Sequence, residues 1–79
     1  FRLTATEWAI LALTIGVVFS AEMINTVAEL AVDLLTQRFH PLAKIAKDAG
    51  AGAVLIAVLA AIAVGIAIFG PRVWALLFG

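Results

Sequence analysis

The sequence contains no cysteine and few charged residues, and these two shortages restrict the class of protein. No disulfide can stabilise the chain, although a soluble domain of only 79 residues buries little surface. Charged residues make up 13% and hydrophobic residues 66%, whereas soluble domains average about 25% and about 45–50%. A net charge of zero gives no support for nucleic-acid binding. The composition predicts one membrane-embedded domain over residues 1–79.

Two long stretches have little or no charge, and each predicts a transmembrane helix. Residues 49–69 are all uncharged, and 21 residues of helix cover a hydrocarbon core of about 30 Å. The Gly-Pro-Arg sequence at 70–72 predicts the end of this helix. Residues 7–36 predict one earlier helix, with Thr4 or Thr6 as its N-cap. We therefore expect an all-α transmembrane hairpin.

The connection between the two helices is short. It covers residues 37–40 and is followed by Pro41, a residue favoured in the first turn of a helix. Residues 41–48 are expected to begin the second helix on the aqueous side, with Lys44, Lys47 and Asp48 on one helical face. Basic residues are concentrated near this connection, so the positive-inside rule predicts that it is cytoplasmic.

Four polar residues within the sequence EMINTVAELAVD at 22–33 form a stripe on the first helix. At 100° per residue, Glu22, Asn25, Glu29 and Asp33 lie within about 80° of one another. A carboxylate in a membrane helix costs roughly 2.5–3.5 kcal/mol. We expect the stripe to face a protein interior or a wet cavity, where it could hold a cation and move a proton.

Small residues recur at every fourth position of the second helix. The positions are Ala49, Ala53, Ala57, Ala61 and Gly65. Such spacing is typical of close helix packing in lipid. A second interpretation is that Gly50 and Gly52 leave room for a ligand beside Asp48.

The polar residues favour phosphoryl transfer to an alcohol in the membrane. Glu22 and Glu29 are two turns apart, about 10 Å along the axis, which predicts different roles for them. A carboxylate can hold a divalent cation, a deeper carboxylate can act as a base, and Lys47 can meet a phosphate. Asn25 could orient a carboxylate or a ligand, whereas Asp33 could simply bridge to Lys47. No glycine-rich phosphate loop is present, so a nucleotide would be held by Mg²⁺ and side chains.

These residues resemble a known family. The segment EMINTVAELAVDLLTQRFHPLAKIAKDAGAGAVLIA at 22–57 is similar to the signature of the prokaryotic integral-membrane diacylglycerol kinases and undecaprenol kinases. Their pattern is E-x-x-N-[ST]-A-x-E-x-x-x-D, a short loop with a histidine, and then A-K-D-x-x-[AG]-x-A-V-L. Val27-Ala28 departs from the pattern but keeps the register to Glu29. By apolar pattern the similarity continues to Phe69.

The resemblance implies a homotrimer with three transmembrane helices per protomer and shared active sites at the cytoplasmic side of the inner (plasma) membrane. The implied substrates are a lipid alcohol and ATP, with Mg²⁺ as the cofactor. By resemblance, Glu22 is the catalytic base and Glu29 the metal ligand. The other implied site positions are the nucleotide contacts Lys47 and Asp48, the loop Arg38, Phe39 and His40, and the polar residues Asn25 and Asp33. Outside the resemblance, a loop or capping role is also open to His40.

The family's N-terminal amphipathic helix and first transmembrane helix have no counterpart in residues 1–79. We therefore expect an upstream segment that carries part of the site. Two alternatives stay open: a proton- or cation-handling transport subunit, and a non-catalytic membrane fragment or assembly subunit. The residues do not choose between undecaprenol and diacylglycerol as the lipid. HPLAKIAKD at 40–48 resembles the Gram-positive-type members of the family, and this resemblance favours undecaprenol.

Overall fold

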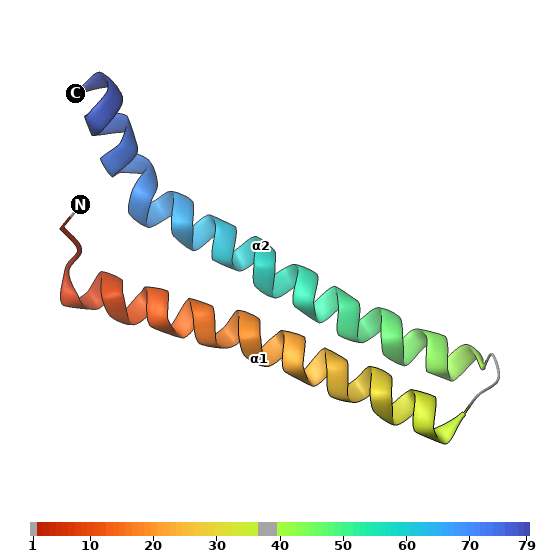
Figure 1. The fold of residues 1–79 in the computed structure, drawn as a ribbon. Helices are drawn as coiled ribbons and strands as arrows, with labels where there is room; N and C mark the ends of the chain where they lie inside the picture. The colour runs from red at the N-terminus through yellow and green to blue at the C-terminus, as the bar shows by residue number, and fades with distance from the viewer. Residues whose placement is uncertain (1, 37–39) are drawn as a thin grey trace.

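The computed structural model describes residues 2–36 and 40–79, which form two long antiparallel helices. Helix α1 covers Ala5–Leu35 and helix α2 covers Pro41–Phe78. The molecule measures 58 × 23 × 12 Å, and both chain ends lie at the same end of the hairpin (Figure 1). Both helices are long and apolar enough to cross a membrane. The predicted all-α hairpin is confirmed for the described residues.

Helix α1 begins with a capping box formed by Thr4 and Glu7. The backbone N–H of Glu7 donates to Thr4 Oγ1 at 3.1 Å, and the backbone N–H of Thr4 donates to Glu7 Oε1 at 2.9 Å. This reciprocal pair satisfies two N–H groups that a helix start leaves open. Thr4 rather than Thr6 is therefore the N-cap.

Helix α2 begins at Pro41, as its sequence predicts. His40 is the N-cap, and its Nδ1 accepts a hydrogen bond of 3.1 Å from the backbone N–H of Leu42. The fixed φ of proline suits the first helical position, where its missing N–H has no helical partner to lose. The capping role considered for His40 is therefore confirmed.

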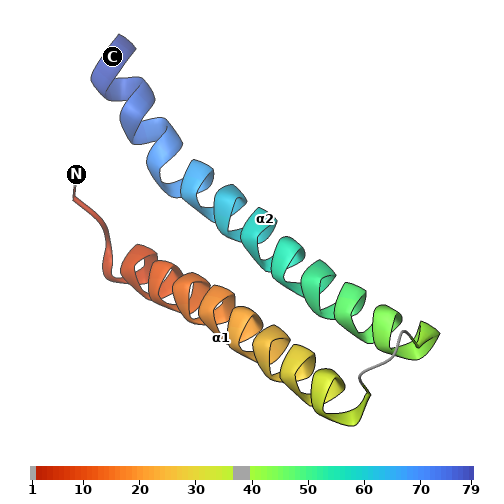
Figure 2. The ribbon, with the colours of Figure 1, turned by 45° about the vertical axis from the view of Figure 1, so that its right-hand side comes forward.

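The predicted stop at 70–72 is wrong, because α2 continues through Pro71 to Phe78. Proline removes one helical hydrogen bond and bends a helix, but it does not have to end it. The next side chain supports this segment: Arg72 donates to the Ile68 carbonyl at 2.5 Å and to Glu7 Oε1 at 2.6 Å. In both ribbon views the last turns of α2 lead away from α1 (Figure 2).

The two helices meet along one seam, defined by the least exposed positions on each. On α1 these positions alternate in spacing between four and three residues, the pattern of a coiled coil, and a subset of the less exposed positions on α2 has the same spacing. The seam of α1 consists of Glu7, Leu11, Thr14, Val18, Ala21, Asn25, Ala28 and Val32. The seam of α2 consists of Ala43, Lys47, Gly50, Val54, Ala57, Ala61, Val64 and Ile68. Part of the predicted small-residue stripe thus packs within the chain, whereas Ala49 and Ala53 are exposed.

Most large apolar side chains face outward, as expected of a membrane hairpin. Leu13, Ile24 and Ile56 are examples, each with more than half of its surface exposed. Two hydroxyls within α1 do not need water, because Thr14 and Thr26 donate to the carbonyls of Ile10 and Glu22. Such bonding to the preceding turn satisfies a polar group in lipid.

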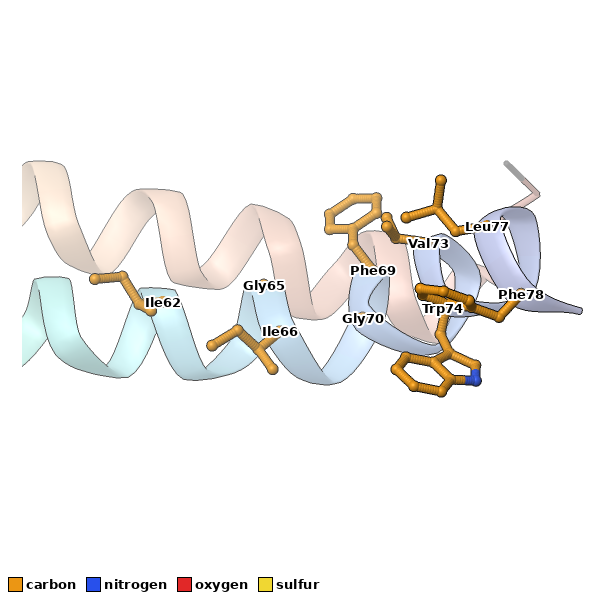
Figure 3. A pocket seen from close by; sticks show the side chains of 9 residues that line it. All are labelled: Ile62, Gly65, Ile66, Phe69, Gly70, Val73, Trp74, Leu77 and Phe78. Carbon is orange, nitrogen blue, oxygen red and sulfur yellow. The ribbon is translucent and has the colours of Figure 1, made fainter.

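A shallow apolar groove runs along α2 where the helix bends (Figure 3). Gly65 and Gly70 lack side chains there, and Trp74 stacks at a tilt on Phe78 with ring centroids 4.6 Å apart. The groove contains almost no polar surface, so it suits acyl chains or another apolar helix.

The seam predicts different outcomes for two alanines of the small-residue stripe. Ala57 is 8% exposed and faces α1, so Ala57→Leu should overpack the seam and destabilise the hairpin by about 1–3 kcal/mol. Ala53 is exposed, so Ala53→Leu should leave hairpin stability unchanged. Unfolding in SDS, followed by the fluorescence of Trp8 and Trp74, measures both. Equal destabilisation by the two variants would contradict this seam.

Candidate functional site

The carboxylates of Glu22 and Glu29 lie beside the seam and are not buried in it. Each follows a seam residue, Ala21 and Ala28 respectively, by one position, and both glutamates are exposed. Helix α2 therefore leaves them uncovered. The predicted stripe is divided: Asn25 enters the seam, whereas the carboxylates occupy the adjoining face of α1.

The helices are tied together at the loop end by an ion pair between Lys47 and Asp33. Lys47 Nζ donates to Asp33 Oδ1 at 2.6 Å, which confirms the bridge considered for these residues. Lys47 also interacts electrostatically with Glu29, one turn deeper. Lys47 therefore joins α2 to Asp33 of α1.

Lys44 and Asp48 form a second ion pair, within α2, at 2.8 Å. Both side chains are well exposed. The spacing of Lys44, Lys47 and Asp48 predicted one common face, but Lys47 turns into the seam. A rotation of 100° per residue separates Lys47 from Asp48.

The antiparallel arrangement places the carboxylates and the Lys44–Asp48 pair on the same side of the hairpin. Residues that precede seam positions on the two helices share a groove on one side, as Leu13 and Val17 do with Ala60. Residues that follow seam positions must therefore share the other side. Glu22 and Glu29 on α1, and Asp48 on α2, all follow seam positions. We call this side the polar face.

The side chain of Asn25 packs against Gly50. A Cβ atom at position 50 would overlap Asn25 Oδ1 and would lie 3.2 Å from Asn25 Cγ. The room that we considered for a ligand at Gly50 is thus occupied, whereas Gly52 faces open space. The sequence analysis did not predict this contact. The one hint in the sequence was a glycine inside a helix, and the structure places that glycine in the seam.

The chemistry of the polar face fits a metal carried by a nucleotide. Within residues 2–36 and 40–79, no three His, Asp or Glu side chains group closely enough to bind a metal by themselves. Mg²⁺ is often bound by one or two carboxylates together with phosphate oxygens, and the exposed Glu29 can supply one. The predicted nucleotide contacts Arg38 and Phe39 lie outside the described residues, and His40 Nδ1 is occupied by its cap.

Comparison with known families shows which family the chain belongs to. The family model described as prokaryotic diacylglycerol kinase matches residues 1–69, which include all of α1 and most of α2. This chain belongs to the prokaryotic diacylglycerol kinase family. The resemblance inferred from residues 22–57 is confirmed, and the match extends over the first half of α1 as well.

Two curated relatives in the diacylglycerol kinase family are similar to the chain. The undecaprenol kinase of Bacillus subtilis (strain 168) is 48% identical over 71 residues, which cover 90% of this chain and 58% of the relative. The diacylglycerol kinase of Synechocystis is 52% identical over 65 residues, which cover 81% and 37%. The chain therefore spans 58% and 37% of the lengths of these relatives. No solved structure was found to match it.

Exchanging the charges of Lys47 and Asp33 tests whether their ion pair stabilises the hairpin. Lys47→Asp should weaken the hairpin, because it places two carboxylates opposite each other. The double variant Asp33→Lys/Lys47→Asp should restore much of the stability. Because Lys47 and Asp33 are 41% and 60% exposed, the effect should shrink in 1 M salt, where the screening length is about 3 Å.

Unfolding in a nonionic detergent titrated with SDS measures the charge-swap effect. Lys44→Asp is the matched control, because Lys44 pairs within its own helix. Equal stabilities for Lys47→Asp and the double variant would show that the pair does not join the helices.

Proposed function

We propose that the protein phosphorylates a lipid alcohol in the membrane with ATP and Mg²⁺. The polar face carries the proposal: Glu22, Glu29 and Asp48 lie on one side of an apolar hairpin, and Glu29 and Asp48 are near the end where Lys47 joins Asp33. Family membership supports the same chemistry, since both relatives are named as lipid kinases. The whole protein's activity and substrates remain part of this proposal.

In the proposed reaction Glu29 and Glu22 have separate roles. Glu29, one turn deeper than the Lys47–Asp33 pair, would hold Mg²⁺ on the nucleotide. Mg²⁺ bound there would neutralise charge on the phosphates. Glu22 lies two turns deeper and accepts the proton of the lipid hydroxyl as the hydroxyl oxygen bonds to the γ-phosphorus. The bond between the γ-phosphorus and the β–γ bridging oxygen breaks in the same step, and ADP leaves with that oxygen. Lys47 and Asp48 contact the nucleotide in this proposal, as do Arg38, Phe39 and His40 of the loop.

The uncovered carboxylates support an assembly with shared sites. An exposed carboxylate on a membrane helix is unfavourable unless protein or water covers it. In the proposed homotrimer a neighbouring protomer covers Glu22 and Glu29 and completes the site. The basic residues near the loop, among them Lys44 and Lys47, favour a cytoplasmic position for this end in the inner (plasma) membrane.

We expect Glu29→Gln to weaken the apparent affinity for Mg²⁺·ATP, because the amide has the shape of the carboxylate without its charge. Phosphate transfer from radiolabelled ATP to undecaprenol and to diacylglycerol in lipid bilayers, at varied Mg²⁺, measures the change. Glu7→Gln is the matched control, since Glu7 pairs with Arg72 at the far end. An unaltered Mg²⁺ dependence in Glu29→Gln would remove Glu29 from the metal site.

Glu22→Gln should act on turnover instead. Loss of a general base lowers kcat by about 10²- to 10⁴-fold, while the KM for Mg²⁺·ATP should change little. The same transfer assay gives both constants. A raised KM with normal kcat would place Glu22 at the nucleotide and not at the hydroxyl. Transfer to neither lipid by the unsubstituted protein would refute the proposed function itself.

A further inference from the structure

Asn25 is a polar residue in the middle of the seam, between Ala21 and Ala28. Its Oδ1 is buried, and no hydrogen-bond partner for it exists among the described residues. An amide is a costly group to place in an apolar contact without such a partner. Its position therefore needs a reason beyond packing.

The opposing surface of α2 at this point is a glycine. A Cβ on Gly50 would overlap Asn25 Oδ1 and would lie 3.7 Å from Asn25 Cα, so an alanine there would force the amide or the helix to move. By contrast, a Cβ on Gly16, Gly52 or Gly65 would meet no atom within 4 Å. Glycine weakens a helix relative to alanine. At position 50 the contact accounts for it.

The contact also orients the amide. The Cα hydrogen of Gly50 that a Cβ would replace points at Oδ1, and such C–H···O contacts recur between packed helices. A C–H donor selects the oxygen of the amide and not its nitrogen. The three atoms nearest to that Cβ position are Oδ1, Cγ and Cα of Asn25, so Nδ2 is turned away from Gly50.

Glu22 and Glu29 lie one helical turn on either side of Asn25. Positions three before and four after a residue are its neighbours on the helix surface, and here both glutamates lie on the face that adjoins the seam. In the proposed reaction Glu22 meets the lipid hydroxyl and Glu29 holds the nucleotide's metal, so the transferring phosphoryl group passes between them. Asn25 lies between Glu22 and Glu29 along the axis of α1, so its Nδ2 donors are at the depth where the phosphoryl group would pass.

We propose that Gly50 is a positioning residue for the lipid kinase reaction: by receiving Oδ1 of Asn25, it holds the Nδ2 donors toward the transferring phosphoryl oxygens. The inference rests on the proposed function. Donors fixed in place before the reaction stabilise developing charge without reorganisation. Gly50 touches no substrate in this scheme and acts only through Asn25.

Gly50→Ala tests this role, with Gly16→Ala as the control, because a Cβ at Gly16 meets no atom within 4 Å and Gly16 lies outside the proposed site. We expect Gly50→Ala to lower kcat by at least about tenfold, because small displacements of a donor cost up to about 10²-fold, with little change in the KM for Mg²⁺·ATP. Gly16→Ala should keep normal kinetics. Asn25→Ala/Gly50→Ala should be no slower than Asn25→Ala alone, since the two residues act as one unit.

Stability separates positioning from packing. Removing the amide relieves the overlap, so the double variant should regain the SDS unfolding midpoint that Gly50→Ala loses, yet its kcat should stay low. Recovery of kcat together with the midpoint would show a packing role only. Additive losses of kcat in the double variant would also overturn the proposal.

Nuclear magnetic resonance tests the contact independently of activity. The sequence contains one asparagine and one glutamine, so the side-chain amides of Asn25 and Gln37 give two pairs of signals. Gly50→Ala should shift the Asn25 pair, and Gly52→Ala should leave it in place. Unmoved Asn25 signals in Gly50→Ala would overturn the contact. If neither lipid is phosphorylated, the proposed function fails. The resonance measurement would still show whether Gly50 contacts Asn25.

Discussion

The close approach of α1 and α2 along one seam determines the position of every other feature. Small residues occupy much of the seam, with Ala21 and Ala28 on α1 and Gly50 and Ala57 on α2. Lipid provides no hydrophobic drive for two helices to associate, so the contact depends on packing and on the polar groups that it pairs. The seam also separates two sides: one carries the carboxylates, and the other is apolar.

Much of the fold could be predicted, because the membrane limits what a chain can do. A polar backbone must bond within its own segment in lipid, so apolar stretches of this length predict helices. The cap at His40 and the turn at Pro41 followed from local chemistry. The end of α2 could not be predicted from local chemistry, because a proline can bend a helix without ending it, and the contact of Arg72 with Glu7 joins residues 65 positions apart.

The candidate site shows a similar division. The acidic residues stood out because a carboxylate is rare in an apolar helix, and the motif from Glu22 to Asp48 then identified the family. Helical periodicity predicted that the polar residues form a stripe on α1. It could not predict which part of that stripe faces α2. For that reason Asn25 entered the seam while Glu22 and Glu29 stayed outside it. The contact of Gly50 with Asn25 joins residues of two helices, which a pattern along one helix does not reveal.

The ion pairs Glu7–Arg72 and Asp33–Lys47 join the two helices at two levels, and the distance between these levels can be compared with the thickness of a membrane. Glu7 and Asp33 are 26 positions apart on α1, and their partners Arg72 and Lys47 are 25 apart on α2, so each helix rises about 38–39 Å between the pairs. A hydrocarbon core of about 30 Å fits inside this span with a few ångströms left at each end. On that scale Glu29 lies about 6 Å from the level of Asp33, close to the headgroups, and Glu22 about 16 Å from it, among the acyl chains. A water-borne nucleotide and a lipid hydroxyl would thus approach one helix face from opposite sides of the interface.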